Sequence, residues 1–196
     1  MISSLTSDSI LEGTSGLPLN VRKAGMSDIA PLLELINGYA AKGIMLPRTE
    51  FEMSENIRDF SVIYSGSNLI GCGALHFYSP VVGEVRSLAV DPNWTTHGAG
   101  RRIVEALLEE ARLFALDAVF AFTYVPGFFR KLDFEEVERG ELPLKVWKDC
   151  LRCPKFQCCD EIAVVRVLRP EHWRGSHMAQ QDIEGPVLLP IVTSHR

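Results

Sequence analysis

The stretch VDPNWTTHGAGRRIVEALLEEARLF, residues 90–114, joins a turn with two glycines to a long amphipathic segment. Apolar side chains recur at helical spacing from Ile103 to Phe114, with glutamates and arginines on the other face, so a helix is predicted from Gly98 onward. The first N–H groups of a helix lack carbonyl partners within it and carry positive partial charge. The turn is therefore a candidate anion site, although a tight connection without a ligand explains the same residues.

Two phosphate-binding motifs do not fit this turn. A Walker loop requires Gly-Lys-Ser or Gly-Lys-Thr, and here the second glycine is followed by two arginines. The dinucleotide fingerprint requires a third glycine and a βαβ unit, and neither accompanies Gly98 and Gly100. The interpretation of the turn therefore depends on the order of the elements around it.

Hydrophobic patterning predicts strands and helices on both sides of the long helix. The predicted strands are 19–24, two strands around an SGSN turn within 60–78, then 82–90, 118–125 and 161–168. The predicted helices besides the long one are 29–43 and a short helix and turn at 126–134. A chain of 196 residues, of which 46% are apolar, suffices for one α/β or α+β domain and is short for two.

Composition and charge argue against several classes of protein. The formal net charge of -5 offers no basic surface, so no nucleic-acid partner is expected. No apolar run approaches the ~20 residues that span a bilayer, and the start lacks a secretion signal. We therefore predict a cytoplasmic protein without a membrane partner. Residues 1–16, rich in Ser, Thr and Gly, are predicted to be a flexible arm, and residues 169–196 a poorly ordered tail.

The order of elements over residues 19–168 resembles the GNAT acetyltransferase superfamily. The resemblance implies an α+β fold, with one domain at 17–168 and a mixed, mostly antiparallel central sheet flanked by helices. It also implies acetyl-CoA as cosubstrate and no metal. In that family the turn binds the pyrophosphate and the preceding strand pairs with the pantetheine arm. The implied cofactor-binding residues are Leu88, Ala89, Val90, Thr95, Thr96, His97, Gly98, Ala99, Gly100, Arg101 and Phe129.

Five blocks narrow the resemblance further, although Thr95 stands where the superfamily usually has Arg or Gln. The blocks AAKGIMLPR, IGCGALHFY, GEVRSLAVDP, VFAFTYVPGFFRKLDF and ELPLKVWKDCLRCPKFQCCDE look like stand-alone bacterial N-acetylglutamate synthases. This implies acetylation of the α-amine of L-glutamate in arginine biosynthesis, and a homodimer through the C-terminal strands. A GNAT enzyme for another amine and a non-catalytic acyl-CoA-binding module remain alternatives.

Acetyl transfer to an amine needs a base for the amine proton and an acid for the leaving thiolate. The resemblance implies Glu84 as the base, whereas the residues alone favour an ordinary strand carboxylate. Many GNAT enzymes carry a Tyr as the acid where this chain has Phe128 and Phe129. Thr123 is the first candidate for the acid and Tyr124 the second, and both are also compatible with purely structural roles.

A dicarboxylate acceptor needs fixed cations, ideally guanidinium groups. Arg48 matches the Arg of the glutamate synthases, and Arg86 shares a strand face with Glu84 by the period of two. Lys145 and Lys155 are weaker substrate-binding candidates, in the C-terminal block that closes over the acceptor in the family. Each of these residues is also compatible with an exposed structural position, and a lone His76 on the neighbouring strand is expected to be packed or hydrogen-bonded.

Four of the five cysteines lie between Cys150 and Cys159. The two-residue gap from Cys150 to Cys153 suits zinc or an iron–sulfur cluster, but no second such pair completes a tetrahedral site. Reduced structural thiols are therefore preferred over a metal site. Cys72, in an apolar strand, is expected to be a small buried residue.

Overall fold

The computed structural model describes residues 20–139, 142, 153, 155 and 158–173. They form a seven-stranded sheet in the order β1-β2-β3-β4-β5-β7-β6. The strands are β1 (Val21–Lys23), β2 (Phe60–Ser65), β3 (Asn68–Phe77), β4 (Val82–Val90), β5 (Ala118–Thr123), β6 (Glu135–Val137) and β7 (Ile162–Val167). Only the β4–β5 pair is parallel, so the sheet is mixed and mostly antiparallel.

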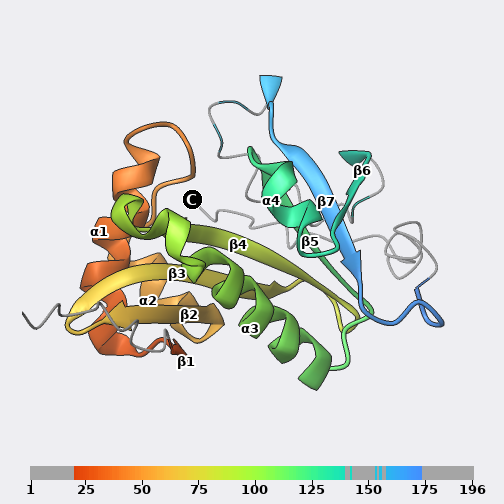
Figure 1. Cartoon of the computed structure of the whole chain (residues 1–196), viewed down its shortest axis with the longest axis horizontal. Coiled ribbons are helices and arrows are strands. Elements are labelled where there is room, and N and C mark those ends of the chain that lie inside the picture. The colour runs from red at the N-terminus through yellow and green to blue at the C-terminus, as the bar shows by residue number, and fades with distance from the viewer. Residues whose placement is uncertain (1–19, 140–141, 143–152, 154, 156–157, 174–196) are drawn as a thin grey trace, which may run out of the picture.

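Helices cover both faces of the sheet (Figure 1). The α-helices are α1 (Ile29–Ala40), α2 (Glu50–Asn56), α3 (Ala99–Leu113) and α4 (Pro126–Arg130), and the 3₁₀ turns are η1 (Met26–Asp28), η2 (Ile57–Asp59) and η3 (Pro92–His97). The apolar stripe of α3 packs on one face, against side chains such as Ile63 and Val85. On the opposite face α1 and α2 pack against Val62, Cys72 and Ala89. Because successive side chains of a strand point to opposite faces, the strands contribute apolar residues to two separate cores.

Strands β4 and β5 run together at their beginnings and then separate (Figure 1). Their parallel register runs from Val82 opposite Ala118 to Glu84 opposite Phe120. Among the described residues, no strand pairs with β4 beyond Glu84 on the edge that faces β5. This separation opens the sheet at the carboxyl ends of two neighbouring strands, where α/β proteins commonly bind ligands.

A β-bulge lies in β4 close to the point where β4 and β5 separate. The β3–β4 register shifts between Cys72 and Ala74, and Ser87 has a positive φ of 51°. An extra residue in one strand bends that strand and re-aims its side chains. The bulge therefore separates the part of β4 that pairs with β5 from the part that leads into the glycine turn.

The predicted elements are found in order, with several corrections. Helix α1 ends at Ala40, before the predicted boundary at residue 43, and 3₁₀ geometry occupies most of the glycine turn. The prediction missed α2 and β6. After β7, a turn places Trp173 against a third apolar cluster that includes Phe120 and Leu142, so packing continues beyond the predicted boundary at 168.

Candidate active site

A cavity of about 430 Å³ opens where β4 and β5 separate, and we call it the splay cavity. Its walls come from the connection between α1 and α2 (43–48), from β4 (84–88), from the end of β5 onward (122–125) and from side chains before β7. Four stretches far apart in the sequence therefore meet at one opening in the sheet.

The glycine turn lies at the end of β4 that borders this opening. Gly98 is the N-cap of α3 and adopts the left-handed conformation, with φ 78° and ψ 6°. Because that conformation disfavours residues with a Cβ, glycine is suited to this position. Arg102 donates its backbone N–H to the carbonyl of Gly98 (3.1 Å), so the N–H groups of Ala99, Gly100 and Arg101 precede the first intrahelical bond.

The other predicted cofactor-binding residues differ in their exposure and in their contacts. Thr95, Thr96 and His97 are exposed on η3, and Leu88 lines the splay cavity. Ala89 is buried in the α1 core, so only its backbone is available to a ligand. The carbonyl of Val90 accepts a hydrogen bond from the Tyr39 hydroxyl (2.6 Å), and Arg101 pairs with Glu105 at 2.7 Å.

Glu84 lies at the last position of β4 that pairs with β5, and it lines the splay cavity. Only 8% of the residue is exposed. Across the sheet it lies opposite His76 of β3, and opposed side chains on one sheet face are neighbours. A carboxylate that is buried, yet borders a cavity, is well placed to exchange a proton with a bound molecule.

Thr123 and Tyr124 lie where β5 ends, and both line the splay cavity. The Thr123 hydroxyl is buried and accepts the backbone N–H of Val125 (3.0 Å), which leaves its proton available for donation elsewhere. Burial raises the pKa of Tyr124, and a hydrogen bond from Lys155 Nζ (3.3 Å) opposes this effect. Phe129 of α4 is both a cavity residue and part of the core.

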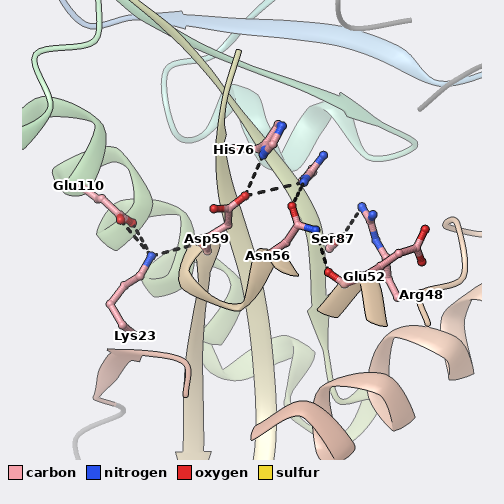
Figure 2. Close-up of polar contacts among 9 residues, drawn as sticks. Lys23, Arg48, Glu52, Asn56, Asp59, His76, Ser87 and Glu110 are labelled. Carbon is pink, nitrogen blue, oxygen red and sulfur yellow. Dashed lines mark hydrogen bonds and ion pairs between the residues drawn. The ribbon is translucent and has the colours of Figure 1, made fainter. Parts of the chain in front are cut away.

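Two predicted cations, Arg48 and Arg86, line the splay cavity from different elements. Asn37 fixes the backbone of Arg48 through two hydrogen bonds of 2.8 and 2.9 Å, and Arg48 Nη2 lies 3.5 Å from the Ser87 hydroxyl (Figure 2). Arg86 follows Glu84 by two residues on β4, the spacing at which side chains share one face of a sheet, and both residues line the splay cavity. Lys145 lies outside the described residues.

Arg139 and Glu161 also line the splay cavity, and the sequence interpretation named neither. The Arg139 guanidinium donates to the carbonyl of Glu161 and lies 5.9 Å from the ring centre of Phe122. Burial raises the pKa of the Glu161 carboxyl, and the charge of Arg139 opposes this effect. Arg139 follows β6, which was too short to be recognised, so no local pattern marked it.

The comparisons with known proteins agree with this geometry. The model of the Acetyltransferase (GNAT) family matches residues 33–134, which include β2 to β5, the glycine turn and α4. The chain belongs to the GNAT acetyltransferase family. The α+β GNAT fold predicted from the sequence is thereby confirmed, and the match spans most of the splay cavity of this GNAT protein.

Two relatives resemble this GNAT acetyltransferase over most of their own length. An N-acetyltransferase of Chlorobaculum tepidum, named as uncharacterized, is 40% identical over 151 residues, which cover 76% of this chain and 96% of the relative. An amino-acid acetyltransferase of Mycobacterium tuberculosis is 36% identical over 137 residues, covering 67% of this chain and 77% of the relative. Both relatives are thus named as acetyltransferases, and one of these two is named as acting on an amino acid.

Two solved structures share the fold and contain coenzyme A. Rv2747 of Mycobacterium tuberculosis, in complex with CoA, has a TM-score of 0.67 and 31% identity, covering 76% of this chain and 99% of that chain. N-acetylglutamate synthase of Neisseria gonorrhoeae, complexed with coenzyme A and N-acetyl-glutamate, has a TM-score of 0.71 and 27% identity. The alignment covers 79% of this chain but only 36% of the synthase chain.

The described cysteines of this GNAT protein differ in their exposure, from buried Cys72 to exposed Cys158. Cys72 is fully buried, as predicted, and burial raises its pKa to about 12. Cys153 and Cys159 line the splay cavity, and Cys159 Sγ lies 3.8 Å from a Glu161 carboxylate oxygen. Within the part of the chain that the structure describes, no three His, Cys, Asp or Glu residues are grouped to hold a metal ion, and Cys150 lies outside it. No described helix is long and apolar enough to cross a membrane.

Proposed function

We propose that this GNAT acetyltransferase transfers the acetyl group of acetyl-CoA to the α-amine of L-glutamate, giving N-acetyl-L-glutamate. The observation that carries the proposal is the charge pattern of the splay cavity, where the buried carboxylate of Glu84 borders the same space as Arg48 and Arg86. Glutamate offers two carboxylates for guanidinium groups and one ammonium for a base.

The residues around the glycine turn fit acetyl-CoA. The backbone N–H groups at the start of α3 form an anion site for the pyrophosphate. The unpaired side of β4 beyond Glu84 offers backbone groups to the amides of the pantetheine arm, and buried backbone groups require such partners. Phe129 at the cavity wall then contacts apolar parts of the arm. The cosubstrate supplies the thioester whose carbonyl carbon is attacked.

Within this arrangement each side chain has a defined task. Glu84 accepts a proton from the glutamate ammonium, which frees the nitrogen lone pair. The nitrogen then forms a bond to the thioester carbon, and the carbon–sulfur bond breaks with its electrons going to sulfur. Thr123, or Tyr124 next to it, donates a proton to the thiolate, and the second proton of the nitrogen replaces it on that hydroxyl, so a neutral amide and the CoA thiol are formed. Arg48 and Arg86 hold the two carboxylates, so the amine faces Glu84.

The named relatives support an amino acid as acceptor. An amino-acid acetyltransferase is among the relatives that match at 30% identity or more, and the N. gonorrhoeae synthase structure contains N-acetyl-glutamate. A cationic acceptor such as a polyamine would face like charges from Arg48, Arg86 and Arg139 in the splay cavity. These charges disfavour that alternative.

The acceptor can be tested by measuring thiol release from acetyl-CoA. We expect L-glutamate to give the highest kcat/KM among L-glutamate, L-glutamine, L-aspartate, L-lysine and spermidine. Arg48→Gln is expected to raise the KM for glutamate by ~10–100-fold because a charge-assisted contact is lost. A preference for spermidine or lysine would overturn the glutamate assignment, and acetyl-CoA binding without turnover of any amine would favour a non-catalytic binding module.

A further inference from the structure

We propose that Asp59 is a positioning residue for the acceptor, acting by holding Arg86 in place at the wall of the splay cavity. This inference rests on the proposed function, because it assigns Arg86 to a carboxylate of the acceptor. Asp59 itself does not line the cavity. It lies behind Arg86, at the end of η2, and reaches the site only through other side chains.

Two contacts of Arg86 come from the α2–η2 segment. Nη2 of Arg86 lies 3.7 Å from Asp59 Oδ2 and 3.4 Å from Asn56 Oδ1. The Arg86 side chain is 10% exposed and that of Asp59 26%, so water screens this ion pair less than an exposed one. A guanidinium has five N–H donors, so contacts at Nη2 are compatible with carboxylate binding.

The segment that carries Asp59 is itself fixed at several points. A capping box of Thr49 and Glu52 starts α2, and Asn56 donates to the carbonyl of Glu52 (2.7 Å). Lys23 Nζ donates to the carbonyl of Asp59 (3.3 Å) while it pairs with Glu110 of α3 at 2.9 Å. Figure 2 shows Lys23 and Glu110 on one side of Asp59, and His76, Asn56 and Glu52 on the other. A rigid support of this kind can transmit a fixed position to Arg86.

His76 is the second side chain that Asp59 holds. Its Nδ1 lies 2.8 Å from Asp59 Oδ2, and the residue lies opposite Glu84 in the β3–β4 register. The Asp59 carboxylate therefore contacts both Arg86, the proposed cation for the acceptor, and His76, which lies opposite the proposed base Glu84. The sequence predicted a packed or hydrogen-bonded His76, and in the structure its partner is Asp59.

An arginine side chain loses much rotamer freedom when it is fixed in one position. If Asp59 and Asn56 impose that loss in the folded protein, the acceptor does not have to impose it on binding, and its affinity rises. The effect belongs to acceptor binding, because Arg86 contacts a carboxylate that is unchanged during acetyl transfer. It should therefore appear in the KM for the acceptor and much less in kcat.

The experiment is steady-state kinetics on full-length wild type, Asp59→Asn, Arg86→Gln and the double variant. We expect Asp59→Asn to raise the KM for glutamate about tenfold, with kcat changed less than about threefold and the KM for acetyl-CoA unchanged. In the Arg86→Gln background, Asp59→Asn should have no further effect on the KM for glutamate, because the arginine through which Asp59 acts is absent. Additive effects in the double variant would overturn the proposal.

Two matched variants separate the proposed role from general damage to the segment. Lys23→Gln removes only one of several contacts that fix the segment and keeps the Asp59 carboxylate, so it should raise the KM for glutamate much less than Asp59→Asn does. In His76→Gln, Asp59→Asn should still raise the KM; loss of the effect there would assign it to His76 and overturn the role of Arg86.

The test also distinguishes this proposal from the proposed function. If wild type acetylates another amine and not glutamate, the proposed function fails, and the same four-variant cycle on that amine still measures the coupling of Asp59 to Arg86. If no amine is turned over, NMR of the Arg86 guanidinium gives the answer. Its Nε–H signal should exchange slowly with solvent in wild type and faster in Asp59→Asn, and equal exchange rates would overturn the proposal.

Discussion

At the scale of single residues, the splay cavity contains two acidic side chains, Glu84 and Glu161. Glu84 extends from the last position of β4 that pairs with β5, whereas Glu161 precedes β7 and accepts a hydrogen bond from Arg139 at its carbonyl. Burial raises the pKa of Glu161, which makes it a competitor for the role of base. The proposed mechanism assigns the proton transfer to Glu84.

Glu84→Gln should lower kcat by ~10²–10⁴-fold, the usual contribution of a general base, with little change in the KM for acetyl-CoA. Glutamine keeps the shape and removes the basic oxygen. The measurement is the initial rate of thiol release at saturating acetyl-CoA and acceptor. Glu161→Gln is the matched control and should retain most of kcat; a larger loss in Glu161→Gln than in Glu84→Gln would reverse the assignment.

Thr123→Val should lower kcat at least about tenfold, because the isosteric valine cannot donate a proton to the leaving thiolate. Tyr124→Phe should lower kcat less than about threefold, since the tyrosine is more exposed and accepts a hydrogen bond from Lys155. Rates at saturating substrates, with circular dichroism to check the fold, compare the two variants. A larger effect in Tyr124→Phe would make Tyr124 the acid.

At the scale of elements, the start of α3 depends on the conformation of one glycine. Gly98 caps the helix with a φ of 78°, and a Cβ built there would meet no other atom within 4 Å. The need for glycine is therefore conformational and not steric. By contrast, a Cβ at Gly73 of β3 would lie 2.8 Å from the Ile103 side chain, so that glycine lets α3 approach the sheet closely.

Gly98→Ala should lower the free energy of unfolding by about 1–2 kcal/mol, the usual cost of the left-handed conformation for an L-residue. It should also raise the KM for acetyl-CoA without changing the KM for the acceptor, because relief of the strain moves the N–H groups at the helix end. Gly38→Ala, in the exposed face of α1, is the control and should stabilise by about 0.5–1 kcal/mol. Urea unfolding and kinetics check both, and an unchanged KM would remove the turn from cofactor binding.

At the scale of the whole molecule, Asp28 ties three parts of the fold together. Its carboxylate accepts hydrogen bonds from Arg22 of β1 (2.7 and 2.8 Å), from the backbone of Gly25 (2.8 Å) and from Tyr64 of β2 (2.8 Å). Only 3% of Asp28 is exposed. The hydrogen bonds from Arg22, above all, hold the pKa of Asp28 well below its usual value of 3.8.

This lowered pKa predicts how stability depends on pH. Because the unfolded chain binds the proton more readily, the contribution of Asp28 is present above about pH 4 and is lost as the pH falls through the folded pKa. Asp28→Asn should lower the free energy of unfolding at pH 7 by about 1–3 kcal/mol, discounted for the half-exposed Arg22. The difference from wild type should begin to shrink as the pH falls below about 4 and should disappear only as the pH falls through the folded pKa.

Urea unfolding at several pH values measures this dependence. Glu105→Gln, which removes an exposed ion pair with Arg101, is the control and should change stability by less than about 0.5 kcal/mol. A difference between wild type and Asp28→Asn that stays constant down to pH 3 would contradict the linkage. It would mean that Asp28 contributes by shape and not by its charge.

The sequence by itself determined the local features of this protein. Periodicity placed α3 and the strands around it, and the glycine turn at Gly98 marked the helix end, because these signals arise among neighbouring residues. The α2 helix was missed although its capping box, Thr49 and Glu52, can be recognised in the sequence. The β6 strand was missed because three residues are too few to show an alternating pattern. The residues near β4 that formed the candidate site were named because a resemblance supplied their roles.

Only the tertiary structure decided which of those residues meet. The separation of β4 from β5 follows from the sheet order and the bulge at Ser87, neither of which has a local signature. Arg139 reaches the cavity only because β6 pairs beside β7. Asp59 stands behind Arg86 because η2 leads into β2, two strands away in the sheet. Contacts between distant residues depend on how strands pair and helices pack, and a period of two or 3.6 contains no record of that choice.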